Sequence, residues 1–278
     1  MLRLLSIELH KLKYNKSAKV ISIVYFILIT FIALIASIEF KFGDFHFRIA
    51  DQGIFNFPFI WHFNTWIAAI LKLFLAIVIV SMMANEYSNR TLKQNLIDGL
   101  SKKEFILSKF LTVVLFSFVS TLFVFIVSLI LGFIFSDYNE IGIIFSDTEY
   151  LLAYFINLIG FFSFCLFIGI LVKRSAFALG FLLIWSIVEG IIYGFLKWEM
   201  FRDSDSVDSI MQLFPLTSMS NLIKEPFSRL GAVQSAANQL GEAFDKDYSV
   251  QFITVVIVLI WTYLFLYGSY VILKKRDL

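Results

Sequence analysis

The sequence predicts an all-α membrane protein with six transmembrane helices. Of its 278 residues, 59% are hydrophobic and only 16% are charged, and the mean hydropathy is +0.84. A soluble domain of this size cannot bury that much apolar surface. The apolar residues gather in six runs, each long enough to cross a hydrocarbon core of about 30 Å as a helix. Because these runs lack the alternation of a barrel strand, helices are the expected spanning elements.

The six predicted spans belong to one membrane domain, 1–278. No internal repeat or low-complexity linker indicates a second domain. In chain order the predicted spans are 20–38, 64–83, 109–135, 150–172, 176–195 and 250–273.

Charge placement predicts which side of the membrane each loop faces. Asp and Glu predominate on one side of the spans, and Lys and Arg predominate on the other. The basic segments are 1–19, 84–109, 173–174 and 274–278. The positive-inside rule places this basic side in the cytoplasm. We therefore expect a multi-pass protein of the bacterial inner membrane with both termini in the cytoplasm.

The first segment, 1–19, is predicted to be an amphipathic helix in the lipid interface. Leucines recur at helical spacing, and cations that suit anionic headgroups lie beside them. The leucines are Leu2, Leu5, Leu9 and Leu12, and the cations are Arg3, Lys11, Lys13 and Lys16. Two interpretations stay open: a simple anchor beside the first span, or a helix that also contacts a cytoplasmic partner.

A leucine stripe indicates a short helix within 84–109, the segment between the second and third spans. Leu92, Leu96 and Leu100 repeat every four residues on an otherwise polar stretch. Such a stripe has to pack on the membrane helices or on a separate protein. The pattern is compatible with a lever that a partner pushes and with a connecting loop that happens to be helical.

Residues beyond this stripe mark where the helix ends and the next one begins. Gly99 suits a helix C-terminus, and Ser101 with Glu104 forms a capping box that opens the following helix. We therefore predict a helix over 87–100 that lies across the cytoplasmic mouth of the spans.

The same segment resembles the ABC exporter permeases of the second type. Their pattern has an acidic residue after a span, a Gly-Thr pair, a leucine-rich turn, a Pro/Gly-x-Ser-Arg/Lys stretch and a late lysine. Two positions depart from this pattern: Arg90 stands where glycine is common, and Gly99 stands where proline is frequent. The N-terminal helix, the six spans and the long loop before the last span also agree. The matching positions are Glu86, Thr91, Leu92, Leu96, Gly99, Ser101, Lys102 and Lys109.

The resemblance implies a permease that moves its substrate out of the cell. Because the predicted path has few fixed charges, we expect an amphipathic substrate, such as a peptide, lipid or drug. The coupling helix of the permease would dock into a cleft of a separate ATP-binding cassette subunit. Two permease copies, in a homodimer or heterodimer, would surround a central path. The alternative from another class is a non-transporting sensor or immunity subunit that binds a peptide or lipid at its outer loop.

No catalytic site is expected in this chain. The phosphate-binding loop G-x-x-x-x-G-K-[ST] needs a lysine directly after a glycine. None of the 13 glycines is followed by lysine, and the three histidines form no H-E-x-x-H motif. We therefore expect no metal, no cofactor and no nucleic-acid partner, and ATP hydrolysis by another polypeptide.

Two ionisable residues fall inside predicted spans at similar depth. Lys72 lies in the second span and Glu189 in the fifth. An unpaired charge within hydrocarbon costs at least about 2.5 kcal/mol. We therefore predict an ion pair between them. The alternatives are that Lys72 extends outward to the interface and that Glu189 is protonated or faces water.

The outer segment 196–249 is long for a simple connection. An apolar run begins at Phe214, and 232–244 is a candidate for a second short helix. Permeases of the similar family place short helices before the last span at the outer exit of the path, so we expect this segment there. A solvent-exposed cap without substrate contact is the alternative.

Overall fold

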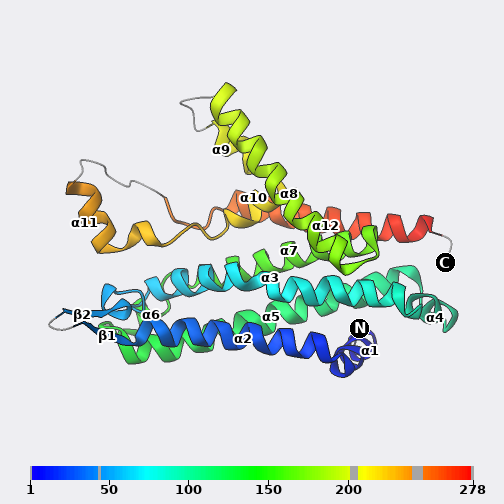
Figure 1. Ribbon diagram of the computed structural model, residues 1–278, viewed down its shortest axis with the longest axis horizontal. Coiled ribbons are helices and arrows are strands. Elements are labelled where there is room, and N and C mark those ends of the chain that lie inside the picture. The colour runs from blue at the N-terminus through cyan, green and yellow to red at the C-terminus, as the bar shows by residue number, and fades with distance from the viewer. Residues whose placement is uncertain (1, 43–44, 201–205, 240–246, 277–278) are drawn as a thin grey trace.

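The computed structural model describes residues 2–42, 45–200, 206–239 and 247–276. Across these residues the chain is almost entirely helical, as expected. Four long helices lie side by side along the longest axis of the molecule, and α8 leans away from them (Figure 1). The four are α2 (Lys16–Ser37), α3 (Phe59–Ser88), α5 (Lys102–Phe135) and α7 (Glu149–Val172). The remaining long helices are α8 (Ser175–Phe195) and α12 (Phe252–Lys275).

The described helices account for the predicted spans. Five stretches, containing α3, α5, α7, α8 and α12, are long and apolar enough to cross a membrane. The pair of α1 (Leu2–Tyr14) and α2 adds a sixth if it counts as one span, although it is bent by 89°. α5 begins before the predicted 109, because the Ser101 and Glu104 side chains form the predicted capping box there. α3 extends past the predicted 64–83 at both ends.

Several short elements lie at the end of the molecule opposite to both termini (Figure 1). The prediction of a purely helical chain is modified there by a hairpin, in which Glu39 pairs with Arg48. The elements at this end are β1 (Glu39–Phe42), β2 (Phe45–Arg48), η1 (Ile49–Gln52), α6 (Ile141–Ile144) and α11 (Gly231–Gln239). Both termini and α4 (Thr91–Ile97) lie at the other end, which we call the basic end. Its assignment to the cytoplasm stays a prediction.

The segment between α8 and α12 is not confined to the end of the molecule opposite the basic end. Its elements are η2 (Leu196–Met200), α9 (Ser206–Met211), α10 (Pro215–Ser220) and η3 (Phe227–Arg229). α10 packs between α7, α8 and α12. The Trp261 indole, from the middle of α12, donates to the Leu213 carbonyl at 2.8 Å, and the amide of Asn157, from the middle of α7, donates to the Met219 carbonyl. Parts of this segment, 201–205 and 240–246, lie outside the described residues, so the predicted helix over 232–244 is seen only as α11.

Small residues allow the long helices to approach closely, which is a common device in membrane proteins. Gly160 of α7 faces Val258 of α12, and an added Cβ would lie 2.8 Å from the Val258 Cγ1 atom. Farther along, the hydroxyls of Tyr25, Ser120 and Tyr154 form a buried cluster that joins α2, α5 and α7. Packing and hydrogen bonds therefore hold the bundle together without large polar surfaces.

We predict that Gly160→Leu destabilises the bundle. The larger side chain has to displace Val258, and overpacking of this kind costs about 1 to 3 kcal/mol. The measurement is the melting temperature of the purified protein in detergent. Gly180→Leu is the matched control, because a Cβ at Gly180 of α8 would meet no atom within 4 Å. Equal melting temperatures for the two variants would contradict the close α7–α12 contact.

Candidate functional site

The short helix α4 joins α3 to α5 at the basic end. The sequence predicted a helix over 87–100, but Tyr87 and Ser88 complete α3, and α4 has only 7 residues. The helix is therefore shorter than predicted, because the second span continues farther. It remains a rigid link between two long helices.

The C-terminal end of α4 has the structure that its glycine predicts. Gly99 has φ 94°, in the left-handed region that glycine adopts without strain. Its amide donates to the Leu96 carbonyl at 3.2 Å, and the Leu100 amide donates to the Asn95 carbonyl at 3.0 Å. This pair of bonds is a Schellman motif, which fixes the direction of the chain into α5.

The leucine stripe of α4 faces the protein itself. Leu92 is buried, and Leu96 and Leu100 are partly buried against the hydrophobic core. The opposite face is exposed to solvent and is mostly polar, apart from Ile97, which is 69% exposed. The exposed residues, which we call the outer face of α4, are Lys93, Gln94, Ile97 and Asp98. A partner that contacts α4 therefore meets the outer face and not the leucines.

A buried charge network lies directly behind α4. The Lys109 ammonium, which is 0% exposed, lies 2.6 Å from a Glu8 carboxylate oxygen and 2.5 Å from a Glu86 carboxylate oxygen. Both carboxylates are 2% exposed. Because the three residues come from α5, α1 and α3, a single ammonium ties three helices together.

Further groups extend this network to α4 and to solvent. Lys11 lies 2.7 Å from the Glu86 carboxylate and 3.4 Å from that of Glu8, with about a third of its side chain exposed. On the other side of Glu86, the Thr91 hydroxyl donates at 2.6 Å and the Asn95 amide at 3.3 Å. We call Glu8, Lys11, Glu86, Thr91, Asn95 and Lys109 the α1–α5 network.

Sequence reasoning found only part of this network. Glu86, Thr91 and Lys109 were among the predicted residues, whereas Glu8 and Asn95 were missed. Glu8 does carry a signal, because it is the only acidic residue in 1–19. Its isolation in a basic amphipathic helix makes it conspicuous, but the sequence shows neither its burial nor its partner.

Arg276, at the C-terminal end of α12, forms hydrogen bonds with residues beside α4. The Arg276 guanidinium donates to the Ile170 and Leu171 carbonyls at 2.6 and 3.1 Å, and so satisfies the last turn of α7. It also donates to the Tyr87 hydroxyl at 2.9 Å. Lys102, a predicted site residue, donates to the Arg276 carbonyl at 2.9 Å. The start of α5 and the ends of α3, α7 and α12 thus meet beside α4.

Lys72 and Glu189 do not form the predicted ion pair. The Lys72 ammonium donates to the Asn157 amide oxygen at 2.7 Å. Glu189 instead accepts from the backbone amides of Leu216 and Thr217, at 3.1 and 2.8 Å. The prediction was wrong because it left out α10, which packs against α8 and presents its unsatisfied N-terminal amides to the carboxylate.

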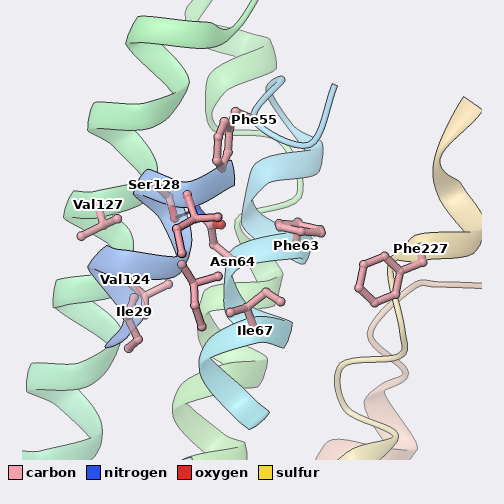
Figure 2. A pocket seen from close by; sticks show the side chains of 11 residues that line it. Ile29, Phe55, Phe63, Asn64, Ile67, Val124, Val127, Ser128 and Phe227 are labelled. Atoms are coloured by element: carbon pink, nitrogen blue, oxygen red, sulfur yellow. Dashed lines mark hydrogen bonds between the residues drawn. The ribbon is translucent and has the colours of Figure 1, made fainter. Parts of the chain in front are cut away.

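An almost wholly apolar cavity of about 260 Å³ lies between α2, α3 and α5 (Figure 2). Its wall includes Ile29 and Val124, and Phe227 stands across from Phe63. The polar groups of the wall are occupied with each other, since the Asn64 amide donates to the Ser128 hydroxyl at 2.8 Å. The cavity suits hydrocarbon and offers no group for acid–base chemistry.

We predict that Lys109→Met strongly destabilises the protein. The substitution leaves two buried carboxylates without their main partner, at a cost of about 3 to 5 kcal/mol. Adding Glu8→Gln and Glu86→Gln to Lys109→Met should recover part of the loss, because the uncompensated charges disappear. The measurement is thermal unfolding in detergent. Lys103→Met, at an exposed position of the same helix, is the control, and a similar loss there would argue against the network.

Comparison with known proteins agrees with this architecture. The family model for ABC-2 family transporter protein matches residues 4–189, which include the α1–α5 network and α4. No curated protein matches the chain. Because the match covers more than half of the sequence and the helices are long enough to span a membrane, the chain belongs to the ABC-2 family of transporter proteins, as a multi-pass membrane permease.

Proposed function

We propose that this chain is the permease subunit of an ATP-driven exporter, and that α4 is the element through which a separate ATP-binding subunit moves it. The main support is the arrangement of α4. Its leucine side is packed on the chain's own helices, while its outer face is open to solvent at the basic end. The basic end would face the cytoplasm of a bacterial cell.

The α1–α5 network explains how a push on α4 would reach the membrane. Glu86 connects α4, through Thr91 and Asn95, to Lys109 and from there to Glu8. Buried charge pairs resist separation, because each ion loses its partner in a poorly solvated place. Displacement of α4 therefore carries α1, α3 and α5 together instead of bending a loop.

The backbone at Arg90 supports a docking role for this residue. Arg90 adopts φ 56°, ψ 16°, a left-handed conformation that costs a residue other than glycine about 1 to 2 kcal/mol. Glycine is common at this position in the permeases that the motif resembles. A strained, exposed arginine suggests that its guanidinium contributes outside the chain, to an acidic group of the ATP-binding subunit.

The proposal also covers the permease dimer and the substrate that it transports. Two permease copies, identical or different, would enclose a path between them, and the exposed apolar surfaces of α8 and α12 would face lipid or the second copy. The substrate would be amphipathic, because ionisable side chains inside the spans are few. Export would be the direction of transport.

We predict that Ile97→Asp uncouples the permease from its ATPase. Ile97 is the exposed apolar residue of the outer face, and a buried apolar anchor at an interface contributes at least about tenfold to affinity. The measurement is copurification of a coexpressed ATP-binding subunit and stimulation of its ATPase activity in liposomes. Leu92→Asp is a poor test, because Leu92 is only 2% exposed and the change would unfold α4.

Ile141→Asp is the matched control for this experiment. Ile141 is 75% exposed and lies in α6, at the opposite end of the molecule. Copurification and stimulation should be unchanged in this variant. If no ATP-binding subunit associates with the native chain, and the chain instead binds a peptide or lipid at its outer segment, the non-transporting sensor or immunity subunit becomes the better description.

Arg90→Gly should separate stability from coupling. Relief of the left-handed backbone raises the free energy of unfolding by about 1 kcal/mol, while loss of the guanidinium lowers ATPase stimulation. Arg90→Ala loses the guanidinium but keeps the strain, so it should lower stimulation without the gain in melting temperature. Full stimulation in both variants would contradict a docking role for Arg90.

A further inference from the structure

A cavity of about 560 Å³ opens between α3, α7, α8 and α10, within the membrane-spanning part of the bundle. This volume falls in the usual range for small-ligand sites, about 300 to 1,000 Å³. Most of its wall is aliphatic or aromatic, and Ile70, Leu73 and Leu183 are exposed at its edge. The cavity therefore combines an apolar interior with an opening at an exposed apolar surface.

Lys72 contributes a positively charged side chain to the wall of this cavity. Its ammonium lies 4.5 Å from the centre of the Phe161 ring and donates one hydrogen bond, to Asn157. No ion pair involves Lys72 among the residues that the structure describes. Because an ammonium has three donors, the group retains capacity for an acceptor from a ligand.

Glu189 shares this wall, but its hydrogen-bonding capacity is occupied. One carboxylate oxygen accepts from the Trp185 indole at 2.7 Å and from the Leu216 amide. The other accepts from the amide and the hydroxyl of Thr217, both at 2.8 Å. Four donors surround the carboxylate and hold the N-terminus of α10. Glu189 therefore offers little to a cationic ligand.

We propose that this cavity binds an amphiphile with an anionic headgroup, with the headgroup on the Lys72 ammonium and the alkyl chain along Leu73 and Leu182. Ser186 and Tyr193 also line the cavity, and each carries a hydroxyl that can donate to a headgroup with several oxygens. A charge-assisted hydrogen bond is strengthened in surroundings of low polarity. The inference rests on the proposed function and narrows the amphipathic substrate to amphiphiles with a negatively charged headgroup.

The test is ligand binding to the purified full-length chain in a neutral maltoside detergent, observed by native mass spectrometry. Dodecyl phosphate is the probe, and dodecyltrimethylammonium and inorganic phosphate are the comparisons. We expect dodecyl phosphate to bind about tenfold more tightly than the cationic amphiphile, which corresponds to about one strong ionic contact. Inorganic phosphate should not bind, because it lacks the chain that the apolar wall holds. Equal binding of both amphiphiles, or preference for the cationic one, would overturn the proposal.

Variants distinguish a binding role for Lys72 from a structural one. Lys72→Met should abolish the preference for dodecyl phosphate, whereas Lys72→Arg should keep it. Lys103→Met is the matched control, because Lys103 also lies near an aromatic ring, Tyr270 at 5.8 Å, but is remote from the cavity. An unchanged preference in Lys72→Met would overturn the assignment.

Ser186→Trp tests whether dodecyl phosphate binds in this cavity, even if Lys72→Met fails to fold. Ser186 is exposed and lines the cavity, so tryptophan fills the space and leaves Lys72 in place. Dodecyl phosphate binding should fall about tenfold, and unchanged binding would exclude the cavity. No ATP or ATP-binding subunit takes part in these measurements. Failure of the binding proposal is therefore distinguishable from failure of coupling at Ile97.

Discussion

The fully buried ammonium of Lys109 is the constraint on which the basic end depends. A charge in this position is tolerated only with carboxylates beside it, and Glu8 and Glu86 supply them from two other helices. Their own burial requires α1 to lie against α3 and α5, and the second oxygen of Glu86 then positions α4 through Thr91 and Asn95. This arrangement determines that the outer face of α4, which includes Ile97, is the side of the helix that a partner can contact.

Local signals in the sequence predicted much of this fold. Hydropathy located the spans, and the capping box at Ser101 and the glycine at Gly99 placed the start of α5 and the end of α4, because each depends on neighbours within a few residues. The length of α4 was predicted less well. Hydrophobic spacing does not reveal that α3 continues through Tyr87, since that helix is extended by contacts with distant parts of the chain.

Long-range partners were harder to predict. The ion pair between Lys72 and Glu189 was inferred from matched depth, which ignores any third element between the two spans. α10 is such an element: it packs against α8 and provides Glu189 with backbone amides, while Lys72 donates to Asn157 of α7, whose own amide donates to the Met219 carbonyl of α10. Both ionisable residues are thereby connected to the two ends of one short helix. Polar groups inside a membrane protein follow the irregular backbone that they satisfy.

The position of α10 also has a consequence for how the chain is made. A six-residue helix is too short to partition into a bilayer by hydrophobicity, so α10 cannot insert as an independent segment. Its contacts lie on α7, α8 and α12, and α12 is synthesised after it. The contacts between α10 and α12 can therefore form only after α12 has been synthesised.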